Sequence, residues 1–148
     1  MIILDTNIIS EVMSTAASPA VVDWLNNQDT ATLYLTTITL AEIRYGLRIL
    51  PQGKRRILLE KKFEQFIENT FLLRILVFDE AAARIYGEIM GHRRELGRPM
   101  SSLDGQIASI ARAHKYALAT RNVRDFEHCG LLLINPFDPK SINGRIVL

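Results

Sequence analysis

Four acidic side chains occupy similar places along the chain, each near the end of a predicted strand or the start of a predicted helix. Asp5 follows the apolar run MIIL, and Glu42 lies in the helix after the strand TATLYLTT. Asp104 opens a helix after SSL, and Asp125 lies in ATRNVRDF, just past the strand YALAT. Carboxylates gathered in one place could hold a divalent cation, which prefers oxygen ligands, or could act as acids and bases.

The same acids also have a simpler interpretation, in which each one caps a helix or a turn. The segments TLAE (39–42) and SSLD (101–104) match the capping-box pattern, in which a hydroxyl and an acid satisfy free N–H groups of a first turn. Asp5 would then cap the first helix, and Asn122 or Asp125 would cap a turn. On this interpretation the chain is a non-catalytic binding module.

Apolar runs and helical periodicity predict strands that alternate with helices. The expected strands are residues 2–5, 30–37, 74–78, 116–120 and 131–135. The expected helices are residues 6–14, a segment starting at Ser18-Pro19, and residues 38–50, 54–71, 80–96 and 102–115. This alternation favours a three-layer α/β/α fold, with helices on both faces of a mostly parallel central sheet of about five strands.

A parallel sheet would bring the four acids to one place. The carboxyl ends of its strands lie along one edge, and ligands bind there, near the point where the strand order reverses. Carboxylates packed at that edge would repel one another, and a hard divalent cation such as Mg²⁺ would relieve the repulsion. The polar side chains expected to orient the acids or bound water are Thr6, Asn7, Ser102, Thr120 and Asn122.

Length and composition are those of one globular domain. The chain has 148 residues, of which 48% are hydrophobic, and a formal net charge of +2. We expect the domain to span residues 1–137 and residues 138–148 to form a flexible tail. Cys129 is the single cysteine, so no intrachain disulfide is possible. The sequence shows neither a signal peptide nor a long apolar run, which favours a cytoplasmic protein with no membrane partner.

Four segments together resemble a known family. The segments ILDTNIIS, TTITLAEIRYGL, SSLDGQIASIARAH and ATRNVRDF, in this order and spacing, are similar to those of the PIN-domain ribonucleases. Within that family the chain most closely resembles the VapC/FitB group, the toxins of bacterial toxin–antitoxin pairs. The resemblance runs from about residue 1 to residue 137 and includes INPF near its end.

This resemblance implies an endoribonuclease that depends on Mg²⁺ or Mn²⁺. It implies that Asp5, Glu42 and Asp104 are the catalytic metal ligands, with a fourth position in the segment TRNVRDF. Where some relatives carry Asp directly after TR, this chain has Asn122. Asp125 is therefore the candidate for the fourth catalytic and metal-binding acid, and Asn122 is the alternative. Such an ion can activate a water and stabilise the departing oxygen of a phosphodiester.

Partners are implied by the resemblance and by the arginines. Toxins of this group form homodimers and bind a DNA-binding antitoxin, and here we expect the antitoxin near the apolar faces of residues 8–25 and 43–50. Several arginines flank the third and fourth acidic segments and are candidates for contacts with RNA phosphates. These are Arg93, Arg94, Arg98, Arg121 and Arg124.

A different enzyme is the remaining alternative. Some phosphatases use an Asp nucleophile after the first strand, and Asp5 occupies that position. Such enzymes usually carry a second Asp two positions later. Here that position is Asn7, which counts against a phosphatase.

Overall fold

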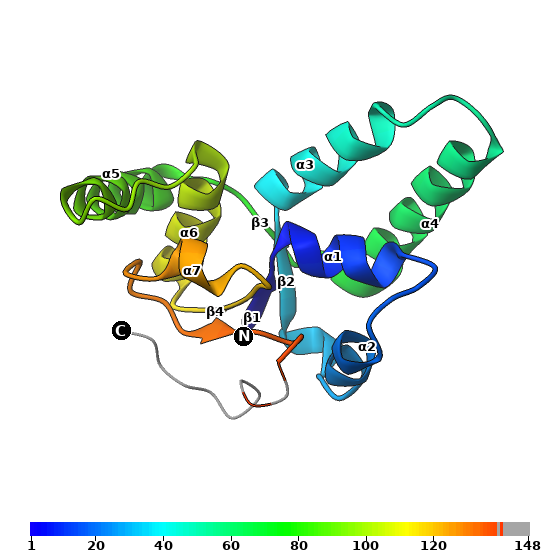
Figure 1. Cartoon of the computed structure of the whole chain (residues 1–148), viewed down its shortest axis with the longest axis horizontal. Helices are drawn as coiled ribbons and strands as arrows, with labels where there is room; N and C mark the ends of the chain where they lie inside the picture. Colours follow the sequence, from blue (N-terminus) through cyan, green and yellow to red (C-terminus); the bar gives the residue numbers. More distant parts are fainter. Residues whose placement is uncertain (139, 141–148) are drawn as a thin grey trace.

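Five short strands form the centre of the molecule, in the order β3-β2-β1-β4-β5 and with every pair of neighbours parallel (Figure 1). The computed structural model describes residues 1–138 and 140. The strands are β1 (Ile2–Leu4), β2 (Leu33–Thr36), β3 (Ile75–Leu76), β4 (Ala117–Ala119) and β5 (Leu133–Ile134). The predicted parallel sheet is confirmed, and its order reverses beside β1.

Helices cover both faces of this sheet (Figure 1). They are α1 (Thr6–Met13), α2 (Pro19–Asn26), α3 (Thr37–Arg48), α4 (Lys54–Phe71), α5 (Glu80–Glu95), α6 (Ser102–His114) and α7 (Val123–Phe126). The helix predicted over 54–71 begins and ends where expected. The short α7 occupies a segment that was expected to be a turn.

The strand predicted over 30–37 is wrong at its start. Residues Thr30–Thr32 form a 3₁₀ helix instead, because the Asp29 carboxylate accepts a hydrogen bond from the N–H of Ala31 at 2.9 Å. A side chain that bonds its own nearby backbone offers the chain an alternative to the strand. Extended structure therefore begins only at Leu33.

Alternating side chains of the strands enter two separate cores. Leu4 and Ala119 point into the core under α1 to α4, whereas Ile3 and Leu118 point into the core under α5 to α7. This alternation is the two-residue period of a strand that is buried on both faces. The predicted three-layer α/β/α arrangement is thereby confirmed (Figure 1).

The order of the strands decides where a ligand would bind. From β1 the chain builds outward through β2 and β3, and it then returns to place β4 on the other side of β1. The carboxyl ends of β1 and β4 therefore border the point where the order reverses, which is where open α/β sheets bind ligands. Asp5 directly follows β1, and Thr120 directly follows β4.

Two further predictions concern membrane spans and the C-terminal tail. Among the described residues, no helix is long and apolar enough to cross a membrane. The tail predicted over residues 138–148 lies outside the described residues, apart from residues 138 and 140.

The contact between α5 and α6 yields a stability prediction. A Cβ added at Gly105 would lie 2.5 Å from Met90 Sδ and 2.9 Å from Tyr86 Cε2, whereas one added at Gly87 would meet nothing within 4 Å. Gly87→Ala should raise the free energy of unfolding by up to about 1 kcal/mol through helix propensity. Gly105→Ala should lower it by about 1 kcal/mol, because the cost of overpacking exceeds the same gain. Urea unfolding of both variants measures the difference, and equal effects would contradict this account of the contact.

Candidate active site

Asp5 is a buried carboxylate that is fixed by three donors. It follows β1, and its own N–H continues the sheet by donating to the Ala119 carbonyl at 2.9 Å. Its side chain is only 4% exposed. Oδ1 accepts from the Thr6 N–H at 2.8 Å, and Oδ2 accepts from Thr120 Oγ1 at 2.7 Å and from Asn7 Nδ2 at 2.9 Å. Asp5 does cap α1, but a cap alone would not require the second and third donors.

Asn7 and Thr120 tie the start of α1 to the loop after β4. Asn7 Nδ2 also donates to Thr120 Oγ1 at 3.2 Å, and Asn7 Oδ1 accepts from the N–H of Arg121 at 3.1 Å. Thr120 Oγ1 further accepts from the N–H of Asn122 at 3.0 Å. Two segments more than 100 residues apart in the sequence are thus held together around the Asp5 carboxylate.

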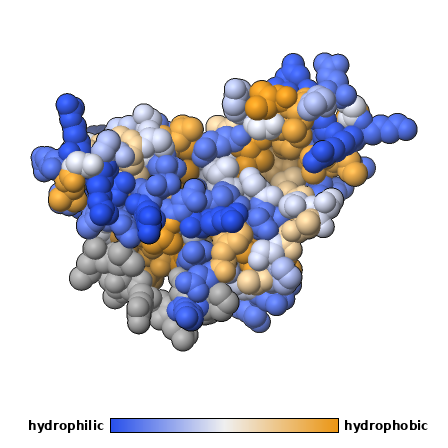
Figure 2. Space-filling model, in the orientation of Figure 1, coloured by the Kyte–Doolittle hydropathy of each residue, from blue (hydrophilic) through white to orange (hydrophobic). Residues whose placement is uncertain are grey.

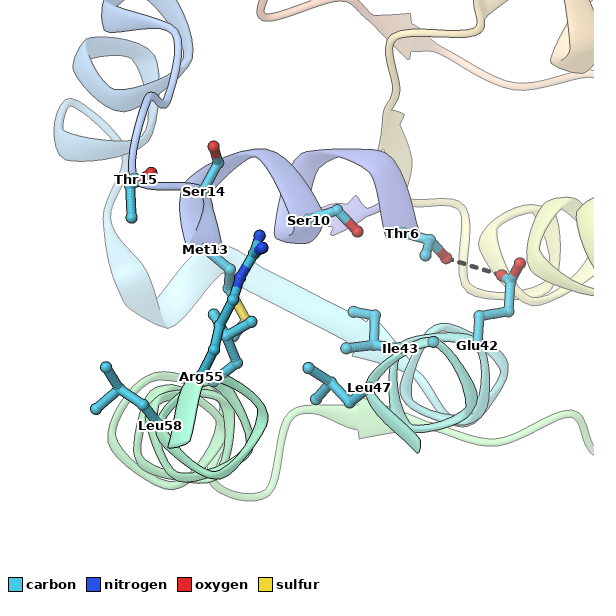
Figure 3. A pocket seen from close by; sticks show the side chains of 12 residues that line it. Thr6, Ser10, Met13, Ser14, Thr15, Glu42, Ile43, Leu47, Arg55 and Leu58 are labelled. Carbon is cyan, nitrogen blue, oxygen red and sulfur yellow. Dashed lines mark hydrogen bonds between the residues drawn. The ribbon is translucent and has the colours of Figure 1, made fainter. Parts of the chain in front are cut away.

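Glu42 does not cap a helix. The N-cap of α3 is Thr36, whose hydroxyl accepts from the N–H of Thr39 at 3.0 Å, so the capping-box interpretation of TLAE is wrong. Glu42 instead lies in the second turn of α3, half-buried. Its Oε1 accepts from Thr6 Oγ1 at 2.8 Å (Figure 3). Thr6 therefore fixes the direction of the Glu42 carboxylate.

Asp104 lies in the first turn of α6 and is half-buried. Its N–H donates to Oγ of Ser101 at 3.1 Å, so the predicted N-cap of this helix is confirmed. Ser102, one of the five residues predicted to support the acids, is the first residue of α6 and is exposed to solvent.

Three of the four predicted acids line one cavity of about 440 Å³. Its lining residues are Asp5, Thr6, Asn7, Ser10, Glu11, Glu42, Asp104, Arg121 and Asn122, and we call this cavity the acidic pocket. Asp125 is exposed and is not among these residues, whereas Asn122, the alternative for the fourth position, is. The gathering of acids expected at the sheet edge therefore holds for Asp5, Glu42 and Asp104.

Burial and neighbouring charges disfavour the ionised acids. The pKa of Asp5 is raised to about 6, chiefly by burial, with a smaller contribution from the negative charges of Asp104 and Glu42, while the hydrogen bonds from Thr120 and Thr6 lower it. Burial also raises the pKa of Asp104, and the charge of Asp125 adds to that rise. Asp125 therefore lies close enough to Asp104 to raise the pKa of that carboxyl, although Asp125 is outside the acidic pocket.

The acidic pocket fits a divalent cation that keeps part of its water. Its acids and amides offer oxygen ligands, which Mg²⁺ and Mn²⁺ prefer, and its raised pKa values are those that a cation would lower. Within residues 1–138 and 140, however, no three acidic, histidine or cysteine side chains stand close enough to ligate one ion together. Mg²⁺ commonly binds one or two carboxylates directly and reaches the others through water, so the donor set suits such an ion.

Glu11 is a fourth acid of the pocket that the sequence analysis missed. Its Oε1 accepts from the N–H of Ser18 at 2.7 Å, which joins α1 to the start of α2. Glu11 follows Asn7 by four residues, so both lie on the same face of α1. This four-residue spacing is the sequence signal that could have identified Glu11, once Asn7 had been assigned to the site.

The predicted RNA-binding arginines lie in different surroundings. Arg93 is only 4% exposed, and its Nη1 donates to the Glu127 carbonyl at 2.7 Å, which argues against the predicted contact with RNA. Arg98 is exposed and pairs with the Glu127 carboxylate at 3.0 Å. Arg94 and Arg124 are exposed. A buried Arg binding a backbone carbonyl holds the loop after α7 in place, so Arg93 is a structural residue.

Comparisons with known proteins identify the family. The family model of the PIN domain matches residues 2–130, so this chain belongs to the PIN-domain family. Within it, the chain is 41% identical to the VapC ribonuclease Y4jK of Sinorhizobium fredii over 94% of this chain and 99% of that one. It is 38% identical to the toxin FitB of Neisseria gonorrhoeae, over 93% and 99% of the two chains. A solved structure of FitAB bound to a DNA fragment has a TM-score of 0.89, covering 93% of this chain and 96% of that one at 38% identity.

The raised pKa of Asp5 predicts how stability depends on pH in the presence of a chelator. The folded-state pKa of about 6 exceeds the unfolded value of 3.8, so the folded state binds the proton more tightly. This group therefore disfavours folding above about pH 6, by about 3 kcal/mol, and the cost disappears as the pH falls toward 4. The Asp5→Asn variant lacks this titration and serves as the reference. Urea unfolding in EDTA should show wild type gaining stability relative to Asp5→Asn between pH 8 and pH 4. A difference that stays constant, or moves the other way, would contradict the assigned pKa.

Proposed function

We propose that this chain is a Mg²⁺- or Mn²⁺-dependent endoribonuclease and the toxin of a toxin–antitoxin pair. The observation that carries the proposal is the acidic pocket, in which Asp5, Glu42 and Asp104 meet at the reversal point of the sheet. Membership of the PIN-domain family and similarity to a VapC ribonuclease support the same conclusion. RNA is the proposed substrate, and the cytoplasm is the proposed location.

In the proposed mechanism the chain's own residues hold and orient the reacting groups. Asp5, Glu42 and Asp104 would hold the ion, some directly and some through bound water, with Asn122 or Asp125 at the fourth position. When bound, Mg²⁺ or Mn²⁺ supplies an activated water and stabilises the departing oxygen of the phosphodiester. Thr120, Asn7 and Thr6 donate to the carboxylates and fix their direction, so less reorganisation is needed when substrate arrives.

The two alternative functions fit the geometry less well. A phosphatase of this kind needs a second acid two positions after its nucleophile, but that position holds Asn7, whose amide donates a hydrogen bond to Asp5. A binding module whose acids are only caps would explain Asp5 and Asp104. It would not explain Glu42, which lies beyond the first turn of α3 and takes its hydrogen bond from a different helix.

A second cavity, of about 410 Å³, suits the proposed antitoxin. It lies between α1, α3 and α4, and Figure 3 shows Ile43 and Leu47 on its α3 side and Arg55 extending from α4 toward α1. Its lining includes Met13, Ile43, Leu47, Leu58 and Leu59, and we call it the apolar groove. Figure 2 shows hydrophobic residues over the α3–α4 hairpin beside this groove. Thr6 and Glu42 line both cavities, so a peptide segment in the groove would end at the acids. Homodimer formation is proposed from the resemblance to the VapC/FitB group.

Metal-dependent cleavage of RNA is the first test of this proposal. Freshly purified protein should cleave total RNA or a tRNA panel with Mn²⁺ or Mg²⁺ and should be inactive in EDTA. Asp5→Ala and Asp104→Ala should each lose at least 100-fold in rate, because each removes a proposed ligand. Glu68→Gln, an exposed acid on α4, should cleave like wild type. If metal-loaded wild type cleaves none of these RNAs, the proposed nuclease function is wrong.

Metal binding can be followed in the same proteins without any substrate. A ligand that binds only the folded state raises the melting temperature by mass action. Mn²⁺ should therefore raise the melting temperature of wild type and of Glu68→Gln but not that of Asp5→Asn. An equal rise in all three would point to binding elsewhere on the surface.

A large side chain in the apolar groove should lower the affinity for the antitoxin. Gly46 lines the groove, and a Cβ there would meet nothing within 4 Å, so Gly46→Phe should fold while occupying the groove. We expect its affinity for the protein encoded beside it in its operon to fall at least ten-fold by calorimetry. Gly87→Phe, on α5, has the same free space but lies outside the groove and is the matched control. Equal affinities of the two variants would place the antitoxin elsewhere.

A further inference from the structure

Arg121 stands apart from the other arginines. It directly follows Thr120 after β4, and within the described residues it is the one basic residue among those that line the acidic pocket. RNA phosphates approaching this pocket would meet the charges of Asp5, Glu42 and Asp104. A cationic side chain at the rim offsets part of that repulsion, and a guanidinium can bind a phosphate through two N–H groups at once.

The backbone and the side chain of Arg121 are each held by a separate contact. Its N–H donates to Asn7 Oδ1 at 3.1 Å, which ties it to the first turn of α1. Its guanidinium carbon lies over the ring of Phe137, 4.8 Å from the ring centre. A cation over an aromatic face within about 6 Å is attracted by the ring quadrupole.

Phe137 is itself fixed in place. Its ring is partly buried against the core under α1 to α4, and its N–H donates to Asn135 Oδ1 at 3.0 Å. The same segment is joined to the loop of Arg121, because the Thr120 N–H donates to the carbonyl of Ile134 at 2.9 Å. The ring is therefore held by contacts of its own that do not involve Arg121.

We propose that Phe137 is a positioning residue, which holds the Arg121 guanidinium at the rim of the acidic pocket to bind an RNA phosphate next to the one cleaved. The inference rests on the proposed ribonuclease function and adds to it one phosphate-binding group and its support. A free arginine loses rotamer freedom when it binds, and a stacked one has lost part of it already. Support from Phe137 thus strengthens substrate binding without touching the reacting atoms.

The experiment compares variants on both sides of the contact. Steady-state cleavage of a defined single-stranded RNA with Mn²⁺ gives KM and kcat for wild type, Phe137→Leu, Phe137→Trp, Arg121→Gln and the double variant Arg121→Gln/Phe137→Leu. Phe137→Leu should raise KM about three- to five-fold and change kcat less, as expected for lost binding that is uniform between ground and transition state. Phe137→Trp should keep KM at or below the wild-type value, because an indole ring attracts a cation more strongly than a phenyl ring does.

Dependence on Arg121 separates positioning from a general structural role. Arg121→Gln should raise KM about ten-fold and should reduce the slope of log affinity against log salt by roughly 0.7, the loss of one single-strand phosphate contact. Phe137→Leu should add nothing in the Arg121→Gln background. An equal three- to five-fold rise in both backgrounds, or an unchanged KM in Phe137→Leu, would overturn the inference.

Two controls make every result decisive. If Phe137→Leu does not fold, 3,4,5-trifluorophenylalanine at position 137 keeps the shape of the ring and weakens its negative face, and KM should still rise. The melting-temperature rise with Mn²⁺ should be intact in each variant, since none removes a proposed metal ligand. Wild type that neither binds nor cleaves RNA would refute the proposed function, whereas active wild type with indifferent variants would refute only the role of Phe137.

Discussion

Burial of one carboxylate at the end of the central strand is the constraint on which the site depends. Taking Asp5 out of water costs on the order of several kcal/mol unless other donors replace its hydration. The Thr6 N–H, Asn7 and Thr120 provide those donors, yet the pKa of Asp5 still rises to about 6. The chain's own donors therefore compensate only part of this cost. The part that remains is free energy that a divalent cation would recover on binding.

The parallel sheet makes this concentration of charge possible. Because β1 lies between β2 and β4, the segments that follow each of these strands converge on Asp5. Thr120, 115 residues after Asp5 in the sequence, donates a hydrogen bond to its carboxylate. Thr6 donates to the carboxylate of Glu42, which follows it by 36 residues. Asp5 and Glu42 thus share one pocket because of hydrogen bonds between distant segments. A local pattern such as a helix cap explains only part of what holds them, although Asp5 and Ser101 do cap their helices.

Sequence reasoning succeeded where a local or periodic signal controls the structure. The apolar runs predicted the five parallel strands, and helical periodicity predicted α4 to the residue. It failed where a distant or competing contact decides. Asp29 caps a 3₁₀ helix where the start of a strand was predicted. Arg93 is buried and donates a hydrogen bond to the Glu127 carbonyl, and Glu11 lines the acidic pocket although it was not predicted to do so. The roles of the acids as metal ligands stay a prediction that the acidic pocket makes physically reasonable.

By itself the sequence determined the alternation of strands and helices and the presence of acids near strand ends and helix starts, because apolar periodicity and residue type are local properties. Only the tertiary structure decided that Asn122 and not Asp125 lines the pocket, and that Arg121 stacks on Phe137. Those outcomes depend on the direction of the chain after β4 and on the segment after β5. The segments after β4 and β5 meet only when the sheet is assembled, so no short stretch of sequence predicts these contacts.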